Sequence, residues 1–237
     1  MITSSNIQSV EKEIRRVAEG CGRLPDDITL VAVTKAFPVE YMIAAYEHGL
    51  KTMGESRIQE AANKLPQFKY RNDTELHFIG HLQSNKVNKV VPLFDVIQSV
   101  DSGHLAKRIG DAAVRIKKRQ IIYLQVNTGK DDNKFGIDSS DALLVAKEVH
   151  QHPGIELGGI MVIAPKTDDK NILCQVFSAT RSIRDEIFKA GIHTCQALSM
   201  GMSNDYHIAI QEGATHVRIG RALFGERPQW KPSTHDN

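Results

Sequence analysis

Residues 28–38 read ITLVAVTKAFP, an apolar run that stops at Lys35, with a proline three residues further on. Such a run is typical of a strand that is buried on both faces, as in parallel sheets. A charge at its end has two explanations: the chain returns to solvent there, or the amine is needed at the rim of a pocket. The following turn contains no glycine, whereas a doubly wound open sheet usually has a glycine-rich turn after its first strand. The stretch therefore favours a closed barrel, with the doubly wound sheet as the alternative.

Seven further apolar runs follow, and they alternate with segments of helical spacing such as residues 103–118 and 172–190. Eight parallel strands, each followed by a helix, close into a (β/α)8 TIM barrel, which is an α/β fold. We expect a single domain over residues 1–237, with the barrel proper at 27–227, an extra N-terminal helix and an irregular tail at 228–237. The predicted strands cover residues 28–34, 51–55, 76–81, 95–100, 120–127, 156–164, 196–201 and 215–220.

The composition argues against several classes of protein. The chain has 237 residues, of which 24% are charged, and its formal net charge of +2 does not indicate a nucleic-acid or membrane partner. Cys21, Cys174 and Cys195 lie far apart and lack the spacing of a zinc site or a disulfide framework. The N-terminus lacks the apolar core of a signal peptide, and no run approaches the roughly 20 apolar residues that cross a bilayer. We expect a soluble, cytoplasmic protein.

Polar side chains follow nearly every predicted strand. In a (β/α)8 barrel the functional residues lie at these carboxyl ends, on the loops that lead into the helices. A purely structural protein would also have polar loops, so this pattern alone supports a pocket only in part. The polar positions and the one proline at these ends are Lys35, Glu55, Ser56, His81, Ser99, Asp101, Asn127, Pro165, Ser199, Ser203, Arg218 and Arg221.

Two cations are expected to face the same cavity. Side chains alternate across a strand, so Val31, Val33 and Lys35 share one face of the first strand. By the same rule His216 and Arg218 share one face of the eighth strand. If both faces look into the barrel, the amine and the guanidinium converge on its mouth. Two cations beside a partly dry cavity are costly without an anion, so we expect a negatively charged ligand there.

The segments at 198–205 and 218–225 form the expected anion site. Each runs from a strand end through a glycine into a helix start, where backbone N–H groups can approach a ligand. Phosphate binding after the seventh and eighth strands recurs in this fold. Together with the inward lysine and arginine, a phosphate site suggests pyridoxal 5′-phosphate (PLP). Arg218 would face the pyridine nitrogen and keep it unprotonated, which disfavours deep carbanion chemistry.

Several motifs resemble those of one family. They are VAVTK (31–35), FIGHLQSNK (78–86), GGIMVIAP (158–165) and LSMGMSNDYHIAIQEGATHVRIG (198–220), which runs on to FGER (224–227). From about Ile7 to Arg227 the chain resembles the YggS-like pyridoxal phosphate homeostasis proteins (the PROSC or PLPBP family). These are related in fold to the N-terminal barrel of alanine racemase. The last motif is long and highly specific, so chance does not explain the match.

The resemblance implies a PLP-binding protein that takes part in intracellular PLP homeostasis without robust catalysis of its own. Lys35 would hold the cofactor as an internal aldimine, and Arg218 would face the pyridine nitrogen. The backbone of the last two loops and two serine hydroxyls would bind the phosphate. Apo PLP-dependent enzymes are candidate partners, and we expect a monomer or a weak dimer. The implied cofactor-binding residues are Lys35, Ser56, His81, Ser199, Met200, Ser203, Arg218, Gly220 and Arg221.

The chain departs from the family pattern at three positions. Ser56 stands where the family usually has an asparagine that would flank the cofactor, so any contact there is shortened or lost. After the fifth strand, Asp131 replaces the usual glutamate. Arg221 replaces a small hydroxyl residue, so that a hydroxyl contact with the phosphate is lost while its backbone N–H remains. Its guanidinium would either replace the hydroxyl or point to solvent, and we favour solvent.

Two other functions are open at this stage. A racemase needs a base on each face of its substrate, and in alanine racemase the second base, a tyrosine, comes from an additional β-domain of the partner subunit. We expect no such domain here, which favours a carrier over a racemase. The other alternative is a barrel that binds a different phosphate ester, with Lys35 as an ion-pair donor.

Two histidines and two lysines also lie where a functional role is conceivable. His77 and His81 share a strand face, but no third ligand for a metal ion is evident, so we expect no metal site. Lys86 and Lys134 would lie near the rim, where a role in gating or handing on the cofactor is conceivable. The simpler interpretation of both is a surface lysine.

Overall fold

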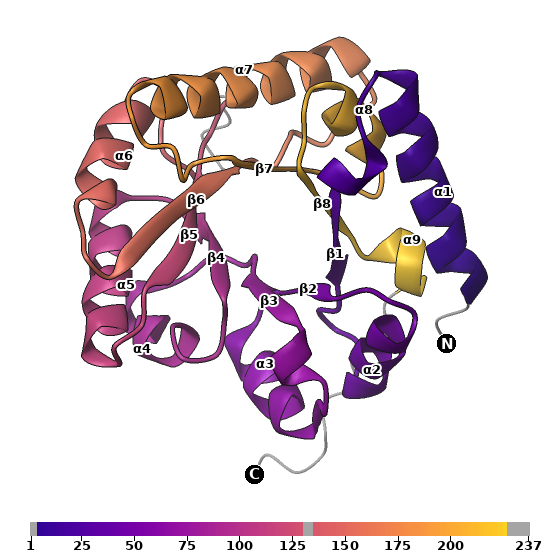
Figure 1. Cartoon of the computed structure of the whole chain (residues 1–237), viewed down its shortest axis with the longest axis horizontal. Helices are drawn as coiled ribbons and strands as arrows, with labels where there is room; N and C mark the ends of the chain where they lie inside the picture. Colours follow the sequence, from indigo (N-terminus) through magenta and orange to yellow (C-terminus); the bar gives the residue numbers. More distant parts are fainter. Residues whose placement is uncertain (1–3, 130–134, 227–237) are drawn as a thin grey trace.

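The computed structural model describes residues 4–129 and 135–226. Eight parallel strands close into a barrel in which each strand pairs with its neighbours in sequence, and β1 pairs with β8. Figure 1 shows the helices arranged around the outside of this ring of strands. The closed strand order confirms the (β/α)8 barrel and excludes the doubly wound sheet. The barrel is consistent with one domain, and the predicted tail at 228–237 lies outside the described residues.

Strands and helices alternate from the first strand onward. The strands are β1 (Thr29–Val33), β2 (Thr52–Glu55), β3 (Glu75–Phe78), β4 (Val96–Val100), β5 (Gln120–Gln125), β6 (Ile155–Met161), β7 (Ala197–Met202) and β8 (His216–Ile219). The helices are α1 (Ser4–Gly20), α2 (Val39–Glu47), α3 (Ile58–Lys64), α4 (Val87–Val90), α5 (Gly103–Arg115), α6 (Ala142–His150), α7 (Lys170–Lys189), α8 (Tyr206–Gln211) and α9 (Arg221–Phe224).

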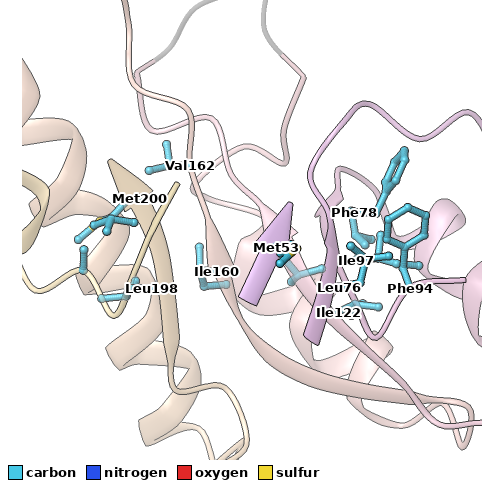
Figure 2. Packing of buried hydrophobic residues seen from close by; sticks show 14 of the residues in the cluster. Met53, Leu76, Phe78, Phe94, Ile97, Ile122, Ile160, Val162, Leu198 and Met200 are labelled. Atoms are coloured by element: carbon cyan, nitrogen blue, oxygen red, sulfur yellow. The ribbon is translucent and has the colours of Figure 1, made fainter. Parts of the chain in front are cut away.

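The main hydrophobic core lies between the strands and the helices. Alternate residues of each strand point outward into it, and Figure 2 shows part of this cluster. Such side chains contribute about 1.5–3 kcal/mol each when they are fully buried. The residues labelled in the view are Met53, Leu76, Phe78, Phe94, Ile97, Ile122, Ile160, Val162, Leu198 and Met200.

The barrel interior contains the intervening residues of each strand. Val96, Tyr123, Met161 and Ala197 form a second, smaller apolar cluster there, separate from the main core. Val31 is fully buried and is absent from the helix-side core. Its register partner on β8 is Arg218, which is also inside the barrel. This arrangement confirms the predicted parity of the first and eighth strands.

Five strands end earlier than the sequence pattern predicts, namely β1, β3, β5, β6 and β8. β1 ends at Val33, so Lys35 lies in the turn after the strand and not at its last position. β3 ends at Phe78 because the chain bends at Gly80, where a Cβ would lie 2.1 Å from the carbonyl oxygen of Ser56. β6 ends at Met161. These early ends move the predicted site residues from the sheet into the loops of the barrel mouth.

The N-terminal helix α1 packs against α8 and α9, the helices that follow the seventh and eighth strands. Its apolar face, which includes Ile7, Val10 and Ile14, belongs to the main core. The side-chain amide of Asn6 donates to the carbonyl of Leu223 over 3.3 Å. The helix therefore supports the loops on which we expect phosphate to bind. Within the described ranges no helix is long and apolar enough to span a bilayer.

Candidate functional site

Lys35 lies in a tight turn at the mouth of the barrel. The N–H of Phe37 donates to the carbonyl of Thr34 over 3.1 Å, and Ala36 adopts a left-handed backbone with φ of 66°. A residue other than glycine rarely adopts this conformation, because its Cβ crowds the backbone there. The turn therefore persists only because its surroundings hold it, and it fixes where the Lys35 backbone sits.

A buried ion cluster of Glu55, Glu60 and Lys64 holds this turn. Lys64 Nζ lies 2.7 Å from Glu55 Oε1 and 2.6 Å from Glu60 Oε1, and it also donates to the carbonyl of Thr34 over 3.0 Å. Glu60 Oε1 accepts the N–H of Ala36 over 2.5 Å. Contacts from the cluster therefore reach the residues on both sides of Lys35.

Burial makes this cluster sensitive to the loss of any member. Glu55 is 0% exposed, and its Oε2 has no hydrogen-bond partner in the described part of the chain. Burial raises the pKa of the Glu55 carboxyl, against the opposing effect of Lys64 and the hydroxyl of Thr34. A buried carboxylate is stable only while its partner is present, because neither charge is solvated. The cluster was not predicted from the sequence, although Glu60 and Lys64 have the spacing of an i,i+4 pair.

Arg218 projects from β8 into the barrel and is 5% exposed. Its Nη1 donates to the carbonyl and the hydroxyl of Ser199, both over 2.7 Å, and its Nη2 donates to the carbonyl of Val162 over 2.8 Å. These acceptors are all neutral, and no described carboxylate forms an ion pair with the guanidinium. Burial lowers the pKa of Arg218 to about 10, so the group remains charged at neutral pH.

The guanidinium of Arg218 has donors to spare. It has five N–H bonds in a fixed plane, and three of them go to the oxygens of Ser199 and Val162. The remaining two, on Nε and Nη2, have no acceptor among the described residues. A buried cation with unused donors fits a ligand that presents a hydrogen-bond acceptor, such as an unprotonated ring nitrogen. The unused donors of Arg218 are therefore the first observation that fits a PLP site.

The turns after β7 and β8 present unpaired backbone N–H groups. Those of Ser203, Asn204, Arg221 and Ala222 donate to no acceptor among the described residues. The Arg221 guanidinium is exposed and donates to Asn204 Oδ1 over 2.7 Å, which ties the two turns together. Adjacent backbone N–H groups that lack partners form a concave site for an anion such as phosphate. This arrangement is the second observation that fits PLP.

Glycines allow the two turns to approach their neighbours closely. Gly201 has φ of +92°, and a Cβ there would lie 2.6 Å from that of Ala209 on α8. At Gly220 a Cβ would lie 3.2 Å from the carbonyl oxygen of Val33. Because Val33 ends β1, this contact puts the turn after β8 beside the turn that carries Lys35. The structure thus brings together the strand ends of Lys35 and Arg218.

The serine and methionine positions of β7 differ in their surroundings. The Ser199 hydroxyl is fully buried; it accepts from Arg218 and donates to Gln98 Oε1 over 2.6 Å. Its contact with phosphate stays a prediction. Both of its hydrogen bonds join it to side chains in the barrel interior, Arg218 and Gln98. Ser203 lies in the turn and is partly exposed. The Met200 side chain packs in the helix-side core, so only its backbone faces the turn.

Ser56 and His81 lie at the rim on the loops after β2 and β3. The backbone of Ser56 packs directly against Gly80, and its side chain is partly exposed. His81 Nδ1 is 3.4 Å from Asp101 Oδ2, and its ring stacks on Phe135 with 3.8 Å between centroids. Phe135 is 56% exposed and was not predicted, because no regular pattern marks it. These contacts form a partly apolar edge of the mouth.

Some predicted positions carry less structural information. Lys86 is exposed in a short 3-10 turn before α4, which agrees with a surface lysine and leaves its role in gating a prediction. Lys134 and Asp131 lie outside the described residues. Within 4–129 and 135–226 no cluster of three metal-binding side chains is present, and His77 contacts Glu75 and Gln98.

Replacing Lys64 with methionine should destabilise the protein by about 3–5 kcal/mol, because the buried Glu55 carboxylate loses its partner. The measurement is the free energy of unfolding in urea. Adding Glu55→Gln to Lys64→Met should recover most of the loss. The matched control is Lys69→Met, because Lys69 and Glu47 form an exposed ion pair at 3.3 Å. This substitution should lower the free energy of unfolding by less than about 1 kcal/mol. Equal losses for Lys64→Met and Lys69→Met would contradict the proposed role of burial.

His216 should make stability depend on pH. Burial, assisted by the nearby charge of Arg218 and opposed by that of Glu75, lowers the pKa of His216 to about 4 from its usual 6.5. As pH falls below 6.5 the unfolded chain gains a proton that the folded protein does not accept, so stability is lost as the solution becomes more acidic. Between about pH 7 and pH 5 the wild type should lose about 1–2 kcal/mol more than His216→Gln. If the free energies of unfolding of the two proteins change equally with pH across this range, the lowered pKa of His216 is refuted.

Comparison with known proteins gives three findings. The family model described as the N-terminal domain of alanine racemase matches residues 5–228. A pyridoxal phosphate homeostasis protein of Pasteurella multocida is 35% identical over 230 residues, which cover 96% of this chain and 98% of the relative. The structure of PipY from Synechococcus elongatus PCC7942 with PLP bound has a TM-score of 0.80 and 34% identity, and the match covers 90% of this chain and 100% of PipY.

More distant structures show the fold alone. An alanine racemase of Clostridium difficile 630 has a TM-score of 0.77 at 16% identity, over 98% of this chain and 62% of the racemase. The full-length matches at about a third identity are much more specific. The chain therefore belongs to the alanine racemase N-terminal domain family and, within it, to the pyridoxal phosphate homeostasis proteins.

Proposed function

We propose that this protein binds PLP in the mouth of its barrel and takes part in intracellular PLP homeostasis, with the cofactor bound covalently to Lys35. The single observation that carries this proposal is Arg218, a buried cation with two unused N–H donors on β8, the strand that pairs with β1 and so with the strand that leads into the Lys35 turn. Membership of the homeostasis family and the PLP-bound structure of PipY support it.

Arg218 is proposed to orient the ring of the cofactor. A guanidinium can only donate, so it pairs with a ring nitrogen that keeps its lone pair. Because Arg218 keeps its charge at neutral pH, it does not give this nitrogen a proton. The ring then attracts electrons weakly, which suits storage and transfer better than carbanion chemistry. This is why we propose a carrier and regulator and not an enzyme.

Lys35 is proposed to supply the covalent anchor. When bound, the cofactor supplies an aldehyde with which a lysine amine condenses, with the loss of one water. The reaction requires the neutral form of the amine. The buried ion cluster of Glu55, Glu60 and Lys64 holds the residues on either side of Lys35, so the amine starts from a fixed position.

The turns after β7 and β8 are proposed to bind the phosphate. The unpaired N–H groups of Ser203, Asn204, Arg221 and Ala222 point to this role, and the Ser203 hydroxyl would add a donor. The backbones of Met200 and Gly220 complete the cradle. The Ser199 hydroxyl is proposed to act on the ligand through Arg218, which it already contacts.

Ser56 and His81 are proposed to flank the cofactor at the open side of the mouth. Ser56 is shorter than the asparagine that is usual in the family, so any contact it makes reaches less far. Apo PLP-dependent enzymes are the proposed partners, and we expect a cytoplasmic monomer or weak dimer. Sedimentation of the purified protein measures whether it is a monomer or a dimer in solution.

Lys35→Ala should abolish the long-wavelength absorption band of an imine in protein mixed with PLP. In the wild type, borohydride should trap the cofactor, and peptide mass mapping should find it on Lys35. Lys86→Ala is the matched control, because Lys86 is an exposed lysine at the same end of the barrel, and its spectrum should be that of the wild type.

Two results would overturn the covalent assignment. One is an unchanged imine band in Lys35→Ala, and the other is a borohydride-trapped adduct on a different lysine. If the wild type binds a phosphate ester equally well without an aldehyde, the site is a general phosphate site and not a PLP site. A changed off-rate of PLP in Lys86→Ala would instead support the gating role of that lysine.

The holo-protein should not exchange the α-proton of L-alanine at the rate of a racemase. NMR in deuterated water measures this exchange directly, and an alanine racemase at equal concentration is the positive control. Exchange at a rate comparable to that of the racemase would make this protein an enzyme.

A further inference from the structure

A line of polar side chains crosses the barrel interior behind Arg218. It joins Arg218 to Ser199, Ser199 to Gln98, Gln98 to His77 and His77 to Glu75. We refer to these five residues as the interior hydrogen-bond chain. It passes from β8 through β7 to β4 and β3, and so it connects strands on opposite sides of the barrel. None of the roles assigned above uses Gln98, His77 or Glu75.

The donors and acceptors of the chain follow from Arg218 itself. A guanidinium can only donate, so the Ser199 hydroxyl accepts from Nη1 over 2.7 Å. That hydroxyl then donates its own proton to Gln98 Oε1 over 2.6 Å. The opposite orientation of the Gln98 amide would leave the Ser199 proton without an acceptor. The amide nitrogen of Gln98 therefore faces His77.

The same reasoning fixes the protonation of His77. Gln98 Nε2 lies 2.5 Å from His77 Nδ1, and an amide N–H can only donate, so Nδ1 is the acceptor. The ring proton is then on Nε2, which contacts Glu75 Oε1. The hydrogen bond from His77 lowers the pKa of the Glu75 carboxyl, which favours its charged form. His77 is fully buried, whereas Glu75 reaches solvent.

All four hydrogen bonds therefore point in one direction, from a buried cation to a carboxylate. Chains in which every donor points the same way strengthen one another by polarisation. No carboxylate of residues 4–129 or 135–226 forms a direct ion pair with Arg218, and the hydrogen bonds couple its charge to that of Glu75. The His77 ring also lies edge-on to Tyr123 and close to His216, whose rings pack around it.

We propose that Glu75, His77 and Gln98 are positioning residues that hold Arg218 in the orientation required to bind the cofactor ring. The proposal rests on the proposed PLP site. Of the three guanidinium hydrogen bonds, the chain holds the acceptor of one, the Ser199 hydroxyl, and so it helps to set the plane in which the unused Nε and Nη2 donors lie. Loss of the chain should let this plane rotate, and the donors would no longer face the ligand.

Gln98→Leu tests the centre of the chain. It removes both hydrogen bonds of the amide at similar volume, and PLP should bind about tenfold more weakly, since a hydrogen bond coupled to a charged group has about this effect. The imine band should also shift in wavelength. The control is Gln120→Leu, because Gln120 is an equally buried glutamine outside the chain, and its PLP affinity should stay within about twofold of the wild type.

Glu75→Leu and Glu75→Gln test the exposed end, where a substitution is tolerated by the fold. Glu75→Leu should weaken PLP binding severalfold, because His77 Nε2 loses its acceptor. Glu75→Gln keeps an acceptor oxygen and should restore most of the affinity. Unchanged affinity in both Gln98→Leu and Glu75→Leu would overturn the positioning role.

NMR of the cofactor-free protein separates this proposal from the proposed function. Nitrogen-15 spectra of the wild type at neutral pH should show His77 as the neutral tautomer with its proton on Nε2. A proton on Nδ1, or a charged ring, would overturn the chain whether or not PLP binds. If His77 has the expected tautomer but the wild type fails to bind PLP, the proposed function fails, and the positioning role for a cofactor fails with it.

Discussion

The site depends on one buried charge, the guanidinium of Arg218. Every hydrogen bond that it makes within the described residues goes to a neutral oxygen, of Ser199 or Val162. A buried cation without a direct ion pair is unfavourable by itself, so its stability depends on the polar groups that surround it. The same lack of a carboxylate leaves two donors for a ligand. A direct salt bridge would have stabilised Arg218 better and would have removed its use as a binding group.

The two ends of the site are held by different kinds of interaction. The Lys35 turn depends on the ion cluster of Glu55, Glu60 and Lys64, which packs on the helix side of the barrel. Arg218 is held from within the barrel by a chain of hydrogen bonds. These supports share no residue. A change on one side can therefore alter the position of the amine without altering that of the guanidinium, which lets mutations separate covalent attachment from ring binding.

The fold could be predicted because hydrophobic periodicity is local: each strand and helix is marked in its own segment. The parity of β1 and β8 also followed from alternation alone, and it put Arg218 in the interior. The supports of the site could not be found in this way, because they join residues far apart in sequence, such as Ser199 and Gln98. A polar Gln98 within an apolar strand was the one available signal. The end of β1 was predicted too late because the left-handed turn at Ala36 has no glycine to mark it.

The departure at Arg221 bears on how the proposed phosphate site would tolerate the loss of a hydroxyl. The long side chain is exposed and donates to Asn204, so it links the two turns. Its backbone N–H finds no acceptor within residues 4–129 and 135–226, and the same holds for those of Ala222, Ser203 and Asn204. Backbone donors are present whatever the side chain, and a link between the turns keeps these donors aligned. In the proposed site, this link would offset the lost hydroxyl contact by holding the backbone donors in place.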